Sequence, residues 1–307
     1  MDLRLMLDRP TEAERAAVDA LLGADQAFNG RIVYGGHSAR AQRHLLLPAL
    51  HAVQDASGAV SRGALAYICD RLTIPPAEAY GVATFYALFD VDGPPGPTIH
   101  VCDDIVCAQH GAEELCAALD EAGTAYQRSP CLGQCDRAPA AMFHEPGTGY
   151  GNAAPVDQRS VATPVFEELP AGLVHQDASE LTLMSRVGVV DPNSLDSYRE
   201  VGGFDVLARA REMGSSAIID ELKRSNLRGR GGAAFPIGIK WEGVRNAPGA
   251  EKYVIANGDE SEPGTFKDRL LMEADPFAVV EAMALYGLAT GASQGYIYVR
   301  GEYPTAE

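Results

Sequence analysis

Two short cysteine pairs, Cys102-Asp-Asp-Ile-Val-Cys107 and Cys131-Leu-Gly-Gln-Cys135, organise the chain and predict a metal site with four thiolate ligands. Iron–sulfur clusters are commonly held by four cysteine thiolates. Structural zinc can also take four, but its pairs are usually closer to the C-x-x-C spacing. The wider gaps favour a 2Fe–2S cluster, with each pair on one iron, and leave zinc and disulfides as alternatives.

The residues around these pairs predict a small α/β domain. TIHVCDD alternates as a strand and ends at Cys102, a helix follows over 111–119, and AYQRSPC forms a second strand ending at Cys131. AAMFHE and a glycine-rich turn predict a hairpin, and VATPVFEEL predicts a closing helix. This order of elements matches a thioredoxin-like α/β sandwich, with both cysteine pairs on loops at one end of the sheet.

The residues before the break at 92–97, which reads DGPPGP, predict a small helical bundle. One amphipathic helix is expected over 12–22 and another over 39–54, bent or divided at Pro48. Ser61 is a candidate N-cap, and Pro76 begins a further helix. Three histidines spaced by seven residues (His37, His44 and His51) are interpreted as solvated or packed side chains.

Composition excludes some classes of protein. The formal net charge of −17 argues against a nucleic-acid surface, which needs clustered Lys and Arg. No apolar run approaches the ~20 residues that cross a bilayer, and the N-terminus lacks the apolar region of a signal peptide. These features predict a cytoplasmic protein, in which disulfides are disfavoured. Cys69 and Cys116 fall at helical spacing among Leu and Ala and are interpreted as small buried residues.

A second informative stretch, Leu227-Arg-Gly-Arg-Gly-Gly-Ala-Ala-Phe-Pro236, is rich in glycine and arginine. Glycines let a ligand approach the backbone, and N–H groups beside arginine suit a phosphate. Gly229, Gly231 and Ala234 fit the G-x-G-x-x-G/A dinucleotide pattern, which requires a preceding strand and a following helix. Here a helix expected over 215–225 precedes the loop, so we reject the usual Rossmann interpretation. A plain surface turn is the alternative.

An acidic turn follows about twenty residues later, where KYVIANGDESEPGTFKDR leads an apolar strand into several carboxylates. Carboxylates can accept hydrogen bonds from sugar hydroxyls, whereas Lys and Arg neutralise phosphate. A solvated acidic loop is the alternative interpretation. The carboxylates are those of Asp259, Glu260, Glu262 and Asp268, and Lys267 and Arg269 lie among them.

The first half of the chain resembles the smaller 2Fe–2S subunit of the bacterial NADH dehydrogenase module. The resemblance rests on ATFYALFDVDG, HVCDDIVC and SPCLGQCDRAPA, and it covers most of residues 35–170. That subunit occurs in respiratory complex I and in NAD-linked formate dehydrogenases and hydrogenases. The resemblance implies that the cluster ligands are Cys102, Cys107, Cys131 and Cys135.

The second half is similar to the larger, flavin-bearing subunit of the same module. The similarity rests on LRGRGGAAFPIGIKW, NGDESEPGTFKDRLLME and YIYVRGEYP, and it implies a site that stacks NADH on FMN. Phe235 would stack on the adenine of the nucleotide, and Glu262 would lie near NADH. Lys240 and the loop would hold the flavin and its phosphate, whereas three residues of the turn would contact the ribityl chain or the ring. The loop residues are Gly229, Arg230, Gly231 and Gly232, and the turn residues are Asn257, Asp259 and Glu260.

The sequence departs from the family pattern at several positions. Ala234 and Ala256 replace a glycine and a cysteine that are usual there, and Gly243 stands where many members carry a stacking aromatic. The flavin subunit also normally continues beyond the position of Glu307, with further flavin contacts and a 4Fe–4S motif.

Together these features predict an α/β protein with four segments: a helical bundle (1–92), a thioredoxin-like 2Fe–2S domain (97–170), a linker (171–200) and a truncated FMN/NADH-binding domain (201–307). The resemblance implies electron transfer between NAD(H), FMN and the cluster, in either direction. It also implies partner subunits with iron–sulfur clusters or molybdopterin. The alternative function is a 2Fe–2S carrier or scaffold subunit that binds no FMN, and a third is a zinc-stapled structural protein.

Overall fold

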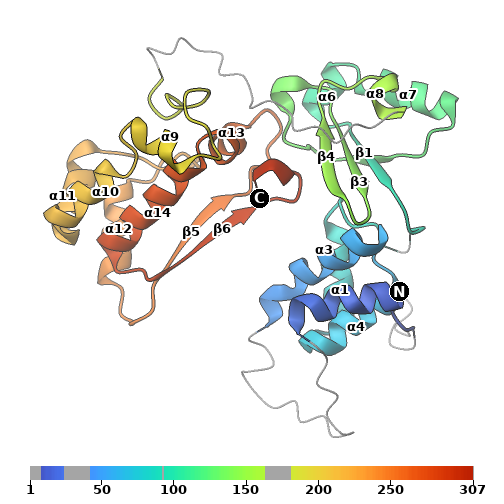
Figure 1. The fold of residues 1–307 in the computed structure, drawn as a ribbon, viewed down its shortest axis with the longest axis horizontal. Helices are drawn as coiled ribbons and strands as arrows, with labels where there is room; N and C mark the ends of the chain where they lie inside the picture. The colour runs from blue at the N-terminus through green and yellow to red at the C-terminus, as the bar shows by residue number, and fades with distance from the viewer. Residues whose placement is uncertain (1–7, 24–41, 92, 163–180, 307) are drawn as a thin grey trace, which may run out of the picture. The chain divides into compact units, whose positions relative to one another are not determined.

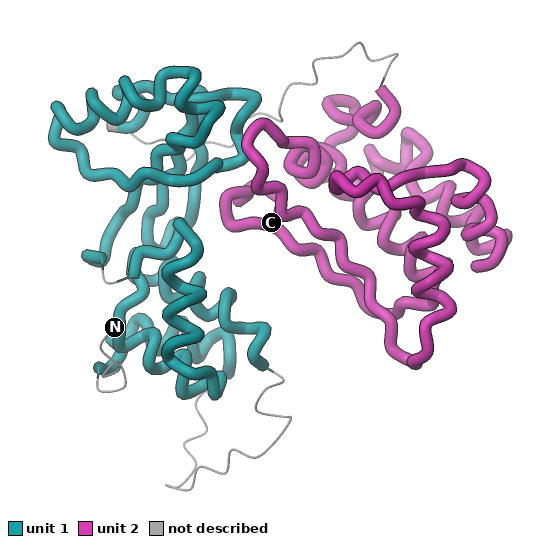
Figure 2. The backbone as a smooth tube through the Cα atoms, turned by 180° about the vertical axis from the view of Figure 1, so that it is seen from behind, with its two compact units in different colours: residues 1–169 teal, residues 170–307 magenta. Residues whose placement is uncertain are grey.

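The structure is a computed structural model, and it describes residues 8–23, 42–91, 93–162 and 181–306. The chain divides into two compact units, residues 1–169 and 170–307 (Figure 2). Each unit has its own apolar core. No helix among the described residues is long and apolar enough to span a membrane.

Unit 1 begins with the predicted helical bundle, which is confirmed (Figure 1). Thr11 begins the first helix with a capping box: its hydroxyl accepts the N–H of Glu14, and the Glu14 carboxylate accepts the N–H of Thr11. The Ser61 hydroxyl accepts the N–H of Ala64 and is the predicted N-cap. The elements are α1 (Glu12–Leu22), η2 (Arg43–Leu45), α3 (Leu46–Ser57), α4 (Arg62–Leu72) and α5 (Pro76–Phe85).

The prediction that Pro48 bends or divides a helix is wrong. Helix α3 starts at Leu46, so Pro48 lies in its first turn, where the missing N–H has no partner within a helix. The one-turn helix η2 precedes it, and residues 39–41 of the predicted helix lie outside the described residues. The ring of His51 packs 4.7 Å from that of Phe89, in agreement with a packing role, and His37 lies outside the described residues.

The rest of unit 1 is a four-stranded sheet in the order β2-β1-β3-β4, with helices α6, α7 and α8, and the thioredoxin-like prediction is confirmed. Strands β1 and β2 are parallel, whereas β3 pairs antiparallel with both β1 and β4. Strand β2 is shorter than predicted and ends at Ser129, before Cys131. The elements are β1 (Thr98–Cys102), α6 (Ile105–Gln109), α7 (Ala112–Ala122), β2 (Gln127–Ser129), η3 (Cys135–Arg137), β3 (Ala141–Glu145), β4 (Gly149–Ala153) and α8 (Gln158–Ala162).

Unit 2 combines helices with a two-stranded parallel sheet of β5 and β6. Its core joins α10, α11 and α14 through Ala210, Ile219 and Ala289, and Trp241 packs against this cluster. The elements are α9 (Leu195–Glu200), α10 (Asp205–Met213), α11 (Ser215–Ser225), α12 (Ile237–Asn246), β5 (Tyr253–Gly258), α13 (Lys267–Ala274), α14 (Pro276–Thr290), β6 (Gln294–Val299) and η5 (Pro304–Ala306).

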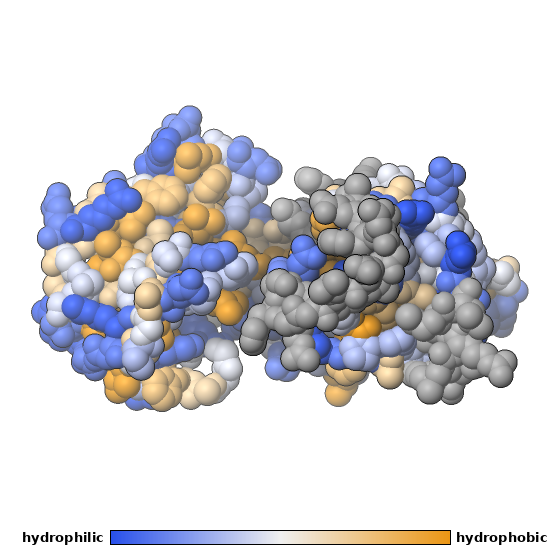
Figure 3. All heavy atoms as spheres, turned by 90° about the horizontal axis from the view of Figure 1, so that it is seen from below, coloured by the Kyte–Doolittle hydropathy of each residue, from blue (hydrophilic) through white to orange (hydrophobic). Residues whose placement is uncertain are grey.

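One face of the β5–β6 sheet is exposed. Ile255 is 65% exposed, and Tyr253, Tyr296 and Tyr298 on the same face are also exposed. Apolar residues are visible on the surface of this unit in the space-filling view (left part of Figure 3). Parallel sheets usually have both faces covered, so this face is unusual for a parallel pair.

A buried carboxylate joins the start of unit 2 to its longest helix. Glu281 in α14 accepts hydrogen bonds from the hydroxyl of Tyr198 at 2.6 Å and from the N–H groups of Phe204 and Leu207 at 3.0 and 3.1 Å. These N–H groups lie at the N-terminus of α10, where helical N–H groups have no partner within the helix. Burial raises the pKa of Tyr198, and its bond to Glu281 adds to that effect.

We expect Glu281→Ala to lower the free energy of unfolding of unit 2 by about 3 kcal/mol, because it leaves buried donors without an acceptor. Trp241 is the only tryptophan in the chain and reports on this unit by fluorescence during urea unfolding. The control is Glu242→Ala, which removes an exposed pair with Lys223 and should cost less than about 1 kcal/mol. Equal effects of the two changes would contradict this role for Glu281.

Candidate cluster and nucleotide sites

The parallel pairing of β1 and β2 brings the two cysteine loops together. Cys102 at the end of β1 is in register with Ser129 at the end of β2. Because the strands run in the same direction, the loops that follow them leave the same edge of the sheet. Cys107 then lies in α6, Cys131 in the loop after β2, and Cys135 at the start of η3.

The four sequence-predicted ligands are adjacent in the structure. Cys102, Cys107 and Cys131 are buried, and Cys135 is half-buried. The sulfur atoms of Cys131 and Cys135 lie 3.3 Å apart, and the Cys102 thiol is hydrogen-bonded to those of Cys107 and Cys131. The bond to Cys107 is the main reason that the pKa of Cys102 is raised to about 11. Binding of a metal group here would therefore release thiol protons.

Backbone N–H groups surround the sulfur atoms. Gly133 donates to the Cys131 sulfur at 3.3 Å, and backbone donors from Asp104 and Ala140 reach Cys102 and Cys107. Such bonds stabilise thiolates and tune the potential of iron–sulfur clusters. Among the described residues, no three or more His, Cys, Asp or Glu side chains are arranged so that they could hold one metal ion. The fit to a cluster rests on the donors, which are four thiols from two loops with N–H groups directed at sulfur.

The remaining cysteines belong to apolar cores. Cys69 packs in the helical bundle, and burial raises its pKa to about 11. Cys116 packs between α7 and the sheet beside Val101 and Leu119. Both are the small buried residues that the sequence predicts.

The glycine loop of unit 2 is closed on itself between α11 and α12. The N–H of Gly229 donates to the carbonyl of Phe235 at 2.9 Å, and the Arg228 guanidinium donates to the carbonyl of Ala234 at 3.2 Å. Ala234 has a φ of 51°, in the left-handed region that favours glycine. The predicted order of helix, loop and Phe235-Pro236 is confirmed, so the local context is not that of a Rossmann fingerprint.

Open space surrounds the central glycines of this loop. A Cβ atom added at Gly231 or Gly232 would meet nothing within 4 Å, and at Gly229 the nearest atom would be 3.7 Å away. At Gly231 the backbone also has no positive φ that would require glycine. The fold of the protein does not explain this glycine, whereas close approach of a ligand to the backbone would. The exposed side chains of Arg230, Phe235 and Lys240 lie in or just after the loop.

The acidic turn follows β5 and places most of its polar side chains in solvent. Asn257 is exposed, and its side-chain oxygen accepts the N–H of Asp259 at 2.9 Å. Asp259 also accepts a bond from the Ser261 hydroxyl at 3.3 Å, and Glu262 is exposed. These side chains are available to a ligand with hydroxyl groups.

Glu260 has a different environment, because it is 3% exposed and contacts the protein itself. Its carboxylate accepts the N–H groups of Asp268 and Arg269 at 3.0 and 3.2 Å and therefore caps the N-terminus of α13. Its carbonyl accepts bonds from the Arg300 guanidinium at 2.5 Å and from the Tyr303 hydroxyl at 3.3 Å. The side chain predicted to contact the flavin thus holds the turn in place.

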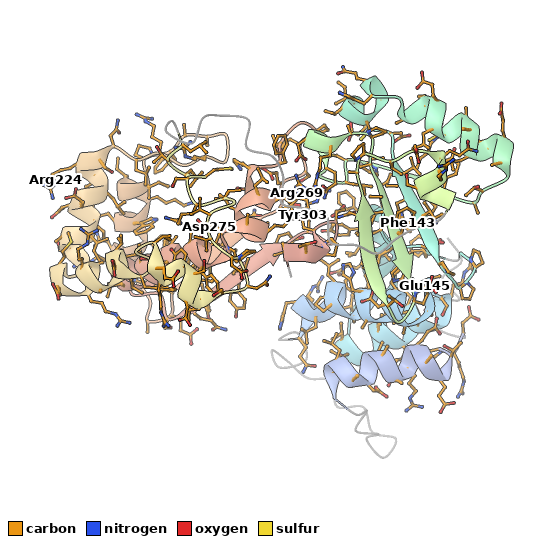
Figure 4. All side chains as sticks on the ribbon, turned by 45° about the horizontal axis from the view of Figure 1, so that its top comes forward. Phe143, Glu145, Arg224, Arg269, Asp275 and Tyr303 are labelled. Atoms are coloured by element: carbon orange, nitrogen blue, oxygen red, sulfur yellow. The ribbon has the colours of Figure 1, made fainter. Side chains whose placement is uncertain are left out.

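Arg300 and Tyr303, for which the sequence predicts no role, support the turn from the C-terminal part of unit 2. Arg269 and Tyr303, which lie side by side, are fully buried (Figure 4). Burial raises the pKa of Tyr303. Arg300 and Tyr303 lie forty or more residues from Glu260, and no local pattern marks contacts at this separation. In unit 1, Asp104 was missed for the same reason, since it contacts Cys131.

We expect Glu260→Ala to lower the free energy of unfolding of unit 2 by about 2–3 kcal/mol, because two N–H groups of α13 lose their acceptor. Glu262→Ala is the matched control, since Glu262 is exposed in the same turn, and it should change stability by less than about 0.5 kcal/mol. Urea unfolding followed by Trp241 fluorescence measures both. A Glu260 variant as stable as the control would show that the cap is unimportant.

Two family models match separate parts of the chain. Residues 35–161 match the thioredoxin-like [2Fe–2S] ferredoxin family, and residues 222–307 match the Nuo51 FMN-binding domain. A relative that spans both is the NAD-reducing hydrogenase HoxS subunit alpha of Cupriavidus necator, 30% identical over 86% of this chain and 47% of that protein. An NADH-quinone oxidoreductase subunit of Rhizobium meliloti is 48% identical over 41% of this chain and 30% of that protein.

A solved structure agrees with these matches. The crystal structure of an NAD⁺-reducing [NiFe]-hydrogenase in the air-oxidized state has a TM-score of 0.65 and 27% identity, over 85% of this chain and 47% of that one. The chain thus spans about a quarter to a half of the length of the relatives it matches. The fusion expected from the sequence is confirmed: one polypeptide carries a segment that matches the thioredoxin-like [2Fe–2S] ferredoxin family and a second segment that matches the Nuo51 FMN-binding domain family.

Proposed function

We propose that this chain is the electron-transfer part of an NADH dehydrogenase, or diaphorase, module that passes electrons between NAD(H), FMN and a 2Fe–2S cluster. The observation that carries the proposal is the meeting of the four thiols at one sheet edge, on a chain that also carries an FMN-binding family domain. The protein supplies binding and orientation, and the cofactors supply the redox chemistry.

In unit 1, Cys102, Cys107, Cys131 and Cys135 would hold the cluster, whose chemistry when bound is the gain or loss of one electron at a time. Burial of the thiols keeps water away from the sulfur atoms. The N–H groups of Gly133, Asp104 and Ala140 would stabilise the negative charge of the thiolates.

In unit 2, the glycine loop and the acidic turn would bind FMN and NAD(H). FMN, when bound, allows exchange between the two-electron chemistry of NAD(H) and one-electron carriers. Gly229, Arg230, Gly231, Gly232 and Lys240 would hold the flavin and its phosphate through N–H groups and positive charge. Phe235 would stack on adenine, whereas Asn257, Asp259 and Glu262 would contact ribityl, ring or nucleotide groups. Glu260 would act by holding the turn.

The relatives are named as subunits of NADH-quinone oxidoreductases and of NAD- or NADP-reducing hydrogenases. By analogy we propose that this chain works within a multi-subunit oxidoreductase in the cytoplasm. That assembly would be an NAD-linked formate dehydrogenase, a hydrogenase or a complex I-like enzyme, with an iron–sulfur or molybdopterin subunit as partner. Electrons would flow in either direction, from NADH to the cluster or from the cluster to NAD⁺.

A second candidate is an electron carrier or scaffold subunit that binds the cluster but no FMN. The exposed face of the β5–β6 sheet favours this second candidate. Parallel strands normally have both faces covered, so a sheet with one open face lacks part of the packing that would hold a nucleotide site in place.

Iron, acid-labile sulfide, zinc and FMN content, measured on protein purified without oxygen, tests the proposal. About two irons and two sulfides with bound FMN support the relay, which NADH-dependent reduction of an artificial acceptor then checks. Iron and sulfide without FMN support the carrier. Zinc without sulfide would overturn the cluster assignment.

The cluster assignment predicts a contrast between two buried cysteines. Cys131→Ala should abolish the visible absorption and electron paramagnetic resonance of the cluster, because it removes one of four ligands. Cys116→Ala alters a core residue of the same domain and should retain the full iron and sulfide content. Loss of the cluster in both variants to the same extent would argue for unfolding, which far-ultraviolet circular dichroism would reveal.

The loop assignment predicts that Gly231→Ala weakens FMN binding about tenfold without lowering the free energy of unfolding. The added methyl group meets no protein atom but occupies space that a flavin phosphate would approach. Gly81→Ala in α5 of the helical bundle is the matched control, since its Cβ also meets nothing within 4 Å and no nucleotide role is assigned to it. Fluorescence quenching of FMN, titrated without NADH, gives both affinities. Equal affinity for FMN in the wild type and in the Gly231 variant would show that this loop does not bind the flavin.

A further inference from the structure

Two consecutive carboxylates, Asp103 and Asp104, lie in the first cysteine loop and have different partners. Asp103 accepts a bond from the Arg128 guanidinium at 3.1 Å, and Arg128 also pairs with Glu113 in α7. The Asp103 charge is therefore offset by a cation at the surface.

Asp104 instead connects the two cysteine loops. One carboxylate oxygen accepts the N–H of Ile105 at 2.7 Å and so caps α6, the helix that carries Cys107. The other oxygen accepts the N–H of Cys131 at 3.2 Å, across 27 residues of sequence. The backbone N–H of Asp104 donates to the sulfur of Cys102.

One residue thus contacts the elements that carry three of the four candidate ligands. In the described part of the chain, the Asp104 carboxylate is bonded to backbone N–H groups, and no cationic side chain pairs with it. Asp104 is half-buried, so its charge is less screened by water than that of a surface carboxylate.

We propose that Asp104 is a positioning residue for the cluster, and that its charge also lowers the reduction potential. This inference rests on the proposed 2Fe–2S site. The carboxylate fixes the distance between the loops, because it accepts an N–H group from each of them. Reduction adds an electron to a group already made negative by four thiolates, and a nearby uncompensated carboxylate disfavours that step.

The first experiment measures how fast the oxidised full-length protein loses its cluster to an iron chelator. Asp104→Ala, which removes both bonds, should speed the loss about tenfold. Asp104→Ser can still cap α6 but cannot reach Cys131, so it should also speed the loss and isolates the bond between the loops. Asp103→Asn is the control, because it changes the adjacent carboxylate without touching the second loop, and its rate should be that of the wild type.

The second experiment measures the midpoint potential by redox titration of the electron paramagnetic resonance signal. Asp104→Asn removes the charge but keeps one acceptor, and it should favour reduction about tenfold, which is a positive shift of about 59 mV for one electron. Asp103→Asn should shift the potential by less, because the Asp103 carboxylate faces the exposed Arg128 side chain, where water screens its charge, and not the backbone of the second cysteine loop.

The outcomes separate this inference from the proposed function. Wild-type protein without iron and sulfide would defeat the cluster site itself. Wild-type protein with a cluster, together with Asp104→Ser and Asp104→Ala variants that lose it at the wild-type rate, would overturn the positioning role alone. Equal acceleration in the Asp103 variant would also overturn it. An unchanged potential in Asp104→Asn would overturn the charge effect. If the alanine variant does not fold, as judged by circular dichroism of the apoprotein, the serine and asparagine variants carry both tests.

Discussion

The parallel pairing of β1 with β2 is the constraint on which the cluster site depends. Cysteines that are separated by more than twenty residues meet because both strands end at the same edge of the sheet, at Cys102 and Ser129. An antiparallel pair would send the two loops to opposite edges. Strand β3 then pairs with the other side of β1, and its register fixes β1 within the sheet.

In unit 2, a single turn contains both a side chain that stabilises the fold and side chains that are free to contact a ligand. Glu260 faces inward and caps α13, whereas Asp259 and Glu262 on either side face solvent. Arg300 and Tyr303 hold the Glu260 carbonyl from the end of the unit, so the turn is fixed at its centre. A turn fixed in this way can present exposed carboxylates in a defined geometry without requiring a ligand to order it.

The sequence predicts much of this arrangement because the signals are local. Strand alternation, Ser61 as a cap, the hairpin of β3 and β4, and the cysteine spacing all depend on neighbouring residues. The prediction for Pro48 is wrong because the effect of a proline depends on its position in the helix. A proline is tolerated in the first turn and bends or breaks a helix further along, and the sequence does not show that the helix begins at Leu46. The roles of Glu260 and Asp104 could not be predicted, since each depends on N–H groups that the fold brings near. From a motif alone, a carboxylate in an acidic turn is expected to contact a ligand. A helix N-terminus attracts the same negative charge, so such a carboxylate can cap a helix instead.

The contrast in burial between the two candidate sites follows from what each would hold. A bound cluster would stay in place, and water at its sulfur atoms would change its potential, which agrees with the burial of three of the four candidate thiols. A nucleotide must enter and leave, so Gly231, Arg230 and Phe235 lie open to solvent. Rigidity is therefore needed between the cysteine loops, where a single carboxylate joins them, and access is needed at the glycine loop. The two units meet these opposite requirements with separate cores, which lets one polypeptide carry both.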